Sequence, residues 1–148
     1  MGKSHFVKHA IQLEGILVRE LFIRVHPNNT YRNNEEKGHF QLETGHFNFD
    51  KEISEIDVGI TIKIGKPDIP EGNENDTEFD LKVHLLAKFS VDQSQFPIEK
   101  IEHWAENNAP LILYPYIREH VHSLSIRAGI RPILLPLMEV PTLRIECQ

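Results

Sequence analysis

The sequence has almost no cysteine and no long hydrophobic run. Cys147 is the single cysteine in 148 residues, so no intrachain disulfide can form. No apolar stretch reaches the length that a membrane span or a secretion signal needs. We therefore expect a soluble cytoplasmic protein that folds as a single domain over residues 1–148 around an ordinary hydrophobic core.

Positive charge is also scarce. The chain carries 16 Lys and Arg against 22 Asp and Glu, which gives a net charge of −6. Proteins that bind nucleic acid depend on clustered Lys and Arg to contact phosphates, whereas the basic residues here are scattered. Nucleic acid is therefore not an expected partner.

The usual signatures of catalysis are missing. No serine lies in a G-x-S-x-G turn, and neither GITIKIG nor RAGIRP has the glycine spacing of a phosphate-binding loop. Cys147 is the penultimate residue, where chain ends usually fray. We do not expect an enzyme, and no cofactor is implied.

Nine histidines raise the question of a metal site. The best local evidence is Glu119-x-x-His122, because residues three apart share a helix face. A di-iron bundle needs this motif twice, with further glutamates, and no second copy is present. His120 and His122 diverge on a helix and would not bind one ion together. We therefore expect no metal site and interpret these histidines as solvent-exposed.

What the sequence does contain is alternation of apolar and polar residues. Residues 78–91 (EFDLKVHLLAKFSV) and 55–65 (EIDVGITIKIG) place an apolar side chain at every second position, which predicts two half-buried strands. In 38–50 the apolar positions change parity across Gly45, which predicts a third strand with a bulge. In 9–26 they change parity twice, as expected for a long bent strand. Four strands in series predict an antiparallel meander.

The second half of the chain has helical spacing. IEKIEHWAEN predicts a short helix, and Ala109 to Ala128 predicts a long one, with Gly129 as its C-terminal stop. One face of the long helix, with Leu113, Ile117 and Val121, enters the core, while Arg118 and Ser125 are expected to be solvated. The predicted fold is α+β, with a four-stranded antiparallel β-meander followed by a short and a long helix packed on the sheet.

Prolines interrupt this helical half. Pro110 is tolerated if Asn108 caps the long helix, because first-turn amides have no intrahelical partner. Pro115 would kink the helix or loosen its first turns. After Gly129, the residues IRPILLPLMEVPTLRIECQ predict an extended segment that lies against the domain and ends in a short strand containing Leu143 and Ile145.

More apolar side chains remain than this small fold is expected to bury. They are Trp104, Ile112, Tyr114, Tyr116 and the segment ILLPLMEVP. Exposed apolar surface of this kind commonly forms an oligomer interface or a binding groove. We therefore expect the protein to act through binding contacts with other chains rather than through catalysis. Pairs of carboxylates at Glu55 and Asp57, and at Glu78 and Asp80, form either a hydrated sheet surface or a protein-binding patch.

The sequence resembles the SecB export chaperones. Their helix contains Pro-x-x-Leu-(Tyr or Phe)-Pro-Tyr-x-Arg-Glu, and this chain matches it with Pro110, Leu113, Tyr114, Pro115, Tyr116, Arg118 and Glu119. Farther along, a similar proline- and leucine-rich pattern contains Ser123, Arg127, Gly129, Pro132, Leu135 and Pro136. The earlier strands resemble the family in pattern only.

The resemblance implies an ATP-independent holdase that binds unfolded or precursor polypeptides and is assembled as a dimer of dimers. The residues that would line its client groove are Trp104, Ile112, Tyr116, Leu134 and Leu135. The acidic sheet face that would contact the SecA motor contains Glu55, Asp57, Glu78 and Asp80.

The family ordinarily continues after the proline-rich loop into a second helix and a polar tail that in many members binds zinc, whereas this chain ends at RIECQ. Binding to SecA therefore stays an expectation that the resemblance alone supplies. A chaperone that serves a toxin–antitoxin system is an alternative. A second alternative keeps the fold but binds one specific folded partner without a role in export.

Overall fold

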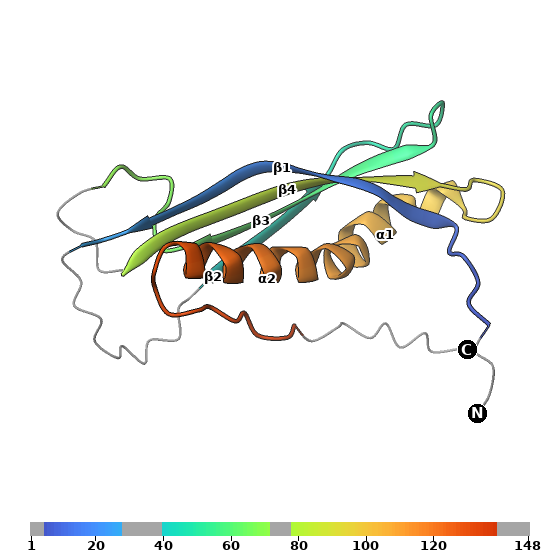
Figure 1. The fold of residues 1–148 in the computed structure, drawn as a ribbon. Helices are drawn as coiled ribbons and strands as arrows, with labels where there is room; N and C mark the ends of the chain where they lie inside the picture. Colours follow the sequence, from blue (N-terminus) through green and yellow to red (C-terminus); the bar gives the residue numbers. More distant parts are fainter. Residues whose placement is uncertain (1–4, 28–39, 72–77, 139–148) are drawn as a thin grey trace, which may run out of the picture.

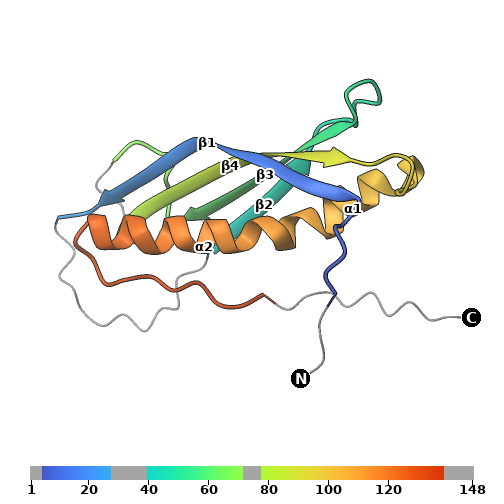
Figure 2. The same ribbon diagram turned by 45° about the vertical axis from the view of Figure 1, so that its right-hand side comes forward.

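The computed structural model describes residues 5–27, 40–71 and 78–138. The sheet consists of β1 (Ile11–Val25), β2 (Phe40–His46), β3 (Glu55–Ile64) and β4 (Phe79–Val91). The helical part consists of η1 (Ile98–Lys100), α1 (Ile101–Asn107) and α2 (Ala109–Arg127). The helices lie on one face of the sheet and leave the other face open (Figures 1 and 2). The predicted α+β architecture is confirmed.

The strands lie in the order β1-β4-β3-β2, and every pair is antiparallel. β2, β3 and β4 form the predicted meander, but β1 lies beside β4 rather than beside β2, so this part of the prediction is wrong. Length gives the physical reason. β1 has 15 residues and β4 has 13, whereas β2 has 7, so β1 can be paired along its full length only by β4.

β1 bends as its sequence predicts. Its register against β4 shifts between Leu13 and Gly15 and again between Val18 and Glu20. Each shift is a β-bulge, which adds one unpaired residue and returns the following apolar side chains to the same face. The two parity changes in the sequence are therefore two bulges in the structure.

The bulge predicted at Gly45 is absent. Gly45 pairs with Gly59, and β2 keeps one continuous register until it ends at His46. The parity changes because the chain leaves the strand: Phe47 is 64% exposed beyond the end of β2, and Phe49 returns to pack partly against the core. Residues 38 and 39 of this prediction lie outside the described ranges.

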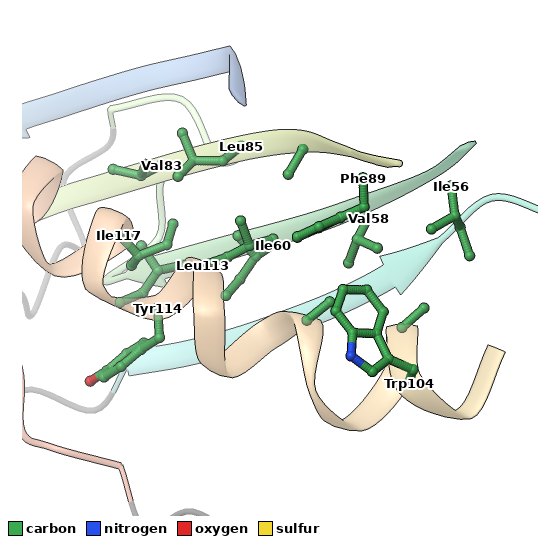
Figure 3. Close-up of a cluster of buried hydrophobic side chains, with 14 of the residues drawn as sticks. Ile56, Val58, Ile60, Val83, Leu85, Phe89, Trp104, Leu113, Tyr114 and Ile117 are labelled. Carbon is green, nitrogen blue, oxygen red and sulfur yellow. The ribbon is translucent and has the colours of Figure 1, made fainter. Parts of the chain in front are cut away.

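The core lies between the sheet and α2. Alternate residues of β3 and β4 point toward the helices, and Leu113 and Ile117 of α2 meet them with no exposed surface (Figure 3). The Trp104 ring contacts Phe89 edge-on, with centroids 5.0 Å apart and planes at 81°. Full burial of one such side chain contributes about 1.5–3 kcal/mol, so these pairs fix α1 and α2 against the sheet.

The junction between the helices differs from its prediction. Asn108 precedes α2, but its side chain makes no capping hydrogen bond. Its backbone stays helical, and its amide donates to the Trp104 carbonyl over 2.8 Å. Because α1 leads directly into α2, the Asn108 side chain has no orphan amide to cap. α2 continues through Pro115, so the proline does not end the helix, and the predicted kink stays a prediction.

Beyond Gly129 the chain runs back along α2 as an extended segment (Figures 1 and 2). This confirms the predicted extended structure as far as residue 138. The predicted strand at Leu143 and Ile145 lies outside the described residues. Within the described residues, no helix is both long and apolar enough to cross a membrane.

Candidate functional site

α2 ends in a tight reversal that sends the chain back along the helix. Gly129 has φ of +77°, a left-handed conformation that glycine adopts without steric penalty. Its amide donates to the Ile126 carbonyl over 3.1 Å, and the Ile130 amide donates to the Ser125 carbonyl over 3.2 Å. These two bonds form a Schellman motif, and they confirm Gly129 as the helix stop.

Three side chains of α2 then hold the returning segment, residues 130–138. The Tyr114 hydroxyl donates to the Pro136 carbonyl. Arg118 Nε donates to the Leu135 carbonyl over 3.2 Å, and Ser125 Oγ accepts a bond from the Ile133 amide over 2.9 Å. Burial raises the pKa of Tyr114, so its hydroxyl keeps the proton that it donates. We call these three side chains the clamp.

Sequence reasoning missed the clamp and placed Arg118 and Ser125 in solvent. Ser125 is fully buried and Arg118 is partly buried. The available signal was the spacing of Tyr114, Arg118 and Ser125, which recurs on one helix face. Prolines in the returning segment also prevent regular strand pairing, so its carbonyls need donors from elsewhere.

The five groove candidates divide into two sets. Ile112, Tyr116 and Leu134 are 41%, 45% and 73% exposed. Trp104 and Leu135 are only 6% and 4% exposed. Trp104 packs on Phe89, and Leu135 points from the returning segment into the core. The expectation that Trp104 and Tyr114 exceed what this chain can bury is therefore wrong, since Tyr114 is also buried.

Further exposed apolar side chains extend this surface. Leu137 and Met138 follow Leu134 on the returning segment, and Ile126 lies near the end of α2, at 51% exposure. We define the client surface as the exposed apolar residues on α2 and the returning segment: Ile112, Tyr116, Ile126, Leu134, Leu137 and Met138. Helical spacing places Ile112 and Tyr116 on the side of α2 away from Tyr114 of the clamp. The structure thus places exposed apolar groups on two elements that the clamp joins.

The four acidic candidates do not form one patch. Asp57 pairs with Lys88 across β3 and β4, so the antiparallel hairpin places it eight residues along β4 from Asp80, roughly 25 Å at about 3.3 Å per residue. Glu55 is beside it, with Lys88 Nζ 3.5 Å from its carboxylate. Glu78 and Asp80 therefore lie at the opposite end of the sheet.

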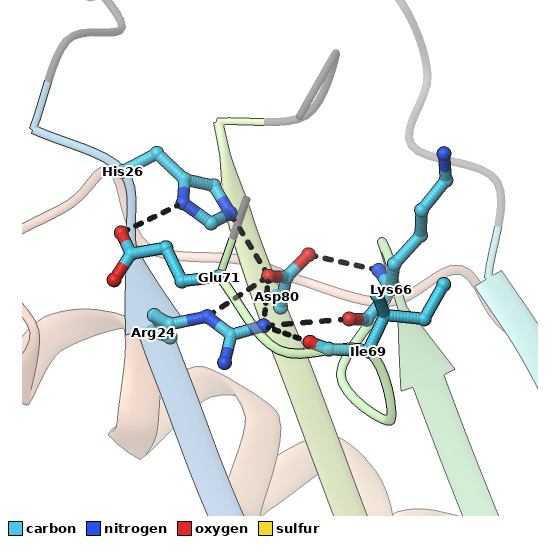
Figure 4. Close-up of polar contacts among 6 residues, drawn as sticks. All are labelled: Arg24, His26, Lys66, Ile69, Glu71 and Asp80. Carbon is cyan, nitrogen blue, oxygen red and sulfur yellow. Dashed lines mark hydrogen bonds and ion pairs between the residues drawn. The ribbon is translucent and has the colours of Figure 1, made fainter. Parts of the chain in front are cut away.

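Asp80 is also not available at the surface, which corrects the expected exposure of this residue. Its side chain is fully buried, and Oδ2 accepts hydrogen bonds from Arg24 over 2.7 Å and lies 2.9 Å from His26 Nε2. Oδ1 accepts a bond from the Lys66 amide over 2.8 Å (Figure 4). Asp80 sits on the predicted strand face, but β1 and the chain after β3 cover it.

These contacts tie three parts of the chain together. The Arg24 guanidinium also donates to the Ile69 carbonyl over 2.8 Å, and His26 Nδ1 lies 3.4 Å from a Glu71 oxygen. Burial acts to raise the pKa of Asp80, but the Lys66 amide, Arg24 and His26 together hold that pKa below its usual value. Asp80 is therefore a structural carboxylate that fastens the start of the β3–β4 loop.

Charged side chains also cross the open face of the sheet. Lys82 Nζ lies 3.2 Å from Glu20 and 3.0 Å from Asp68. Lys63 Nζ lies 2.9 Å from Asp68 and 3.8 Å from Glu43. The two lysines hold the pKa of Asp68 below its usual value. The described residues contain no group of three side chains placed to hold a metal ion.

Comparison with known proteins gives the fold and the family. The sequence model described as Preprotein translocase subunit SecB matches residues 6–143. The Protein-export protein SecB of Saccharophagus degradans is 30% identical over 91 residues, which are 62% of this chain and 48% of that protein. The match to this curated relative thus spans about half of the relative's length.

A solved structure has a similar fold. It is a SecB-like chaperone from Mycobacterium tuberculosis in complex with a ChAD peptide from the HigA1 antitoxin, and it matches with a TM-score of 0.64 at 20% identity. The match covers 87% of this chain and 91% of that one. Because the family match extends over nearly the whole sequence, from residue 6 to residue 143, this chain belongs to the SecB family.

Proposed function

We propose that this protein is an ATP-independent holdase that binds non-native polypeptides at the client surface. The observation that carries the proposal is the exposure of Ile112, Tyr116 and Leu134 on a helix and on a segment fastened to that helix. Membership of the SecB family and the peptide complex of the structural neighbour support it.

The physical basis is the hydrophobic effect. An unfolded chain exposes apolar side chains. Their burial against the client surface is favourable by about 25 cal/mol per Å² of apolar area, and it does not depend on a particular orientation. Such binding tolerates many sequences. The clamp keeps Leu134 extended beside α2, so this side chain cannot withdraw into the core.

We also propose that the active form is a homo-oligomer, a dimer of dimers. β1 forms one edge of the sheet, and Val18 and Leu21 on it are 42% and 46% exposed. An exposed apolar edge strand is a ready site for pairing with a second chain. Several copies would also give one polypeptide several attachment points.

A role in export would need contact with the SecA motor, and Glu55, Asp57 and Glu78 are the remaining acidic candidates for it. One alternative is a chaperone that serves a toxin–antitoxin system, and another is a protein that binds one specific folded partner without a role in export. The two functions separate experimentally, because a holdase prefers denatured clients and a dedicated adaptor prefers its folded partner.

The direct test is suppression of aggregation. The protein is mixed at near-stoichiometric ratio with several chemically denatured clients, without nucleotide, and aggregation is followed by light scattering. We expect suppression by the wild-type protein and a large loss in Tyr116→Asp combined with Leu134→Asp, since each charge opposes burial of a client's apolar groups.

Ile53→Asp is the matched control. Ile53 is 61% exposed in the turn before β3, away from the client surface, so this variant should suppress aggregation as the wild type does. Failure of the wild type with every client would rule out the holdase, and equal loss in all variants would rule out the client surface.

A further inference from the structure

The open face of the sheet carries an apolar row that crosses all four strands. Strand register places Gly45 of β2 beside Gly59 of β3, Gly59 beside Leu86 of β4, and Leu86 beside Leu17 of β1. The helices cover the opposite face (Figures 1 and 2). Leu17 is 56% exposed. Two glycines and two leucines therefore form a low, apolar strip between charged side chains.

Two hollows meet on this strip. The first, which we call the Arg19 hollow, has a volume of about 460 Å³ and is lined by residues that include Arg19, Glu43, Gly45, Phe47, Gly59 and Leu86. The second, the Glu14 hollow, has a volume of about 480 Å³ and is lined by residues that include Glu14, Gly15, Asp57, Leu86 and Lys88. Both volumes fall within the range of ligand pockets, about 300–1,000 Å³.

The charges of the two hollows differ because of the bulges in β1. Glu14 and Arg19 are the extra residues at the two register shifts, and bulges re-aim such side chains. No carboxylate of the described residues lies within ion-pair distance of Arg19. Glu43 shares its hollow, but Lys63 Nζ lies 3.8 Å from that carboxylate. Among the described residues, Arg19 therefore has no carboxylate partner, in a chain of net charge −6.

The apolar part of the Arg19 hollow is suited to a ring. Phe47 stands at its edge and is 64% exposed, and Leu86 forms another wall. A Cβ at Gly45 would meet no atom within 4 Å, and one at Gly59 would meet atoms no closer than 3.8 Å. Steric need inside the chain therefore does not explain either glycine, although glycine weakens a strand and marks places where another chain approaches.

We propose that the Arg19 hollow is a second interface, which takes an acidic segment of a partner protein that carries an aromatic side chain. The ring covers Gly45 and Gly59 and packs against Phe47 and Leu86, as aromatic side chains do over glycines in sheets. A carboxylate beside the ring pairs with the Arg19 guanidinium. This interface lies on the face of the sheet opposite α2 and is independent of the proposed holdase activity.

The test uses the full-length protein and a designed probe. The probe is a fluorescein-labelled peptide with one tryptophan flanked on both sides by aspartate and glutamate, and binding is followed by anisotropy at increasing protein concentration. Two control peptides replace the tryptophan by alanine or the acidic residues by lysine. We expect both control peptides to bind at least about tenfold more weakly.

Variants assign the site. Gly59→Val fills the Arg19 hollow, and Arg19→Glu reverses its charge; each is expected to weaken probe binding by about tenfold or more. Gly59→Val should still fold, because the added Cβ has room and valine favours strands. Gly15→Val fills only the Glu14 hollow and should leave probe binding unchanged. Unchanged binding in Gly59→Val and Arg19→Glu would overturn the proposal, as would absence of binding by the wild type.

A further variant separates this interface from the client surface. The double variant Tyr116→Asp with Leu134→Asp should lose suppression of aggregation and keep full probe binding. If it loses the probe instead, the peptide binds as a client and the second interface is refuted. If Gly59→Val, which lies on the inner strand β3 away from the edge strand β1, changes the mass of the protein in solution, the hollow is a contact between copies of this chain, which also refutes the proposal.

Discussion

At the scale of residues, the signature Tyr114-Pro115-Tyr116-x-Arg118 has two tasks. Tyr114 and Arg118 hold the carbonyls of the returning segment, while Tyr116 is exposed on another side of α2. The sequence identified this stretch as special because of its resemblance to a family. The structure supplies the physical reason, which is that one helix both anchors the segment and presents apolar side chains.

The clamp should contribute measurably to stability. Tyr114→Phe removes the hydroxyl that bonds the Pro136 carbonyl, so we expect a loss of about 0.5–1.5 kcal/mol in the free energy of unfolding. The change is measured by denaturant titration, and proteolysis of residues 130–138 should become faster. Tyr116→Phe is the matched control, because its exposed hydroxyl makes no hydrogen bond within the described residues. Equal losses in both variants would contradict this role of the clamp.

Asp80 should contribute more than any exposed carboxylate. Asp80→Asn leaves Arg24 and His26 without their buried anion, so we expect a loss on the order of 3 kcal/mol. Asp57→Asn, on the same face of the sheet but in β3, should stay within about 0.5 kcal/mol. Because the pKa of Asp80 in the folded protein lies below its usual value of 3.8, the stability difference between wild type and Asp80→Asn should be constant above about pH 5. It should shrink as the pH falls further. A stability difference that grows as the pH falls would show that folding does not lower the pKa of Asp80.

At the scale of elements, the strands and helices were predictable because their apolar periodicity is strong. β3, β4 and α2 agree with the sequence patterns almost to the residue, and both bends of β1 were visible as parity changes. The partner of β1 was not predictable, since alternation gives a strand its buried face but does not say which neighbour it pairs with.

The site was predictable only in part. Ile112, Tyr116 and Leu134 are exposed, which client binding requires, and their role in a client groove stays a prediction. Asp80 and Arg118 were misplaced, because polarity alone does not show whether a side chain meets solvent or a buried partner from a distant part of the chain. Those partners, Arg24 for Asp80 and the Leu135 carbonyl for Arg118, depend on tertiary structure.

The turn after α2 gives a prediction at this scale. Gly129→Ala forces a residue with a side chain into φ of +77°, which should lower stability by about 1–2 kcal/mol and loosen the returning segment. The measurement is thermal or denaturant unfolding, with Gly45→Ala as control, because neither added Cβ would meet another atom within 4 Å. A loss in Gly45→Ala as large as in Gly129→Ala would show that backbone conformation at residue 129 is not the cause.

At the scale of the whole molecule, apolar groups remain exposed on both sides of the sheet and along the edge strand β1. We propose that self-association covers part of this surface and leaves the client surface available. The mass in solution should then be about four times 17.2 kDa, measured by light scattering after size exclusion. A monomer at all concentrations would contradict the proposed dimer of dimers.

Unfolding tests the expectation that residues 1–148 form one domain. In that case the assembled protein should unfold in a single cooperative transition.

The most direct test of the holdase proposal is to locate the bound client. A photo-crosslinking amino acid is placed at position 116, 134 or, as a control, 53, and the protein is irradiated with a denatured client and with the same client folded. Crosslinks to the denatured client from positions 116 and 134, and none from position 53, are the predicted result. Crosslinks of equal strength from all three positions, or a preference for the folded client, would contradict it.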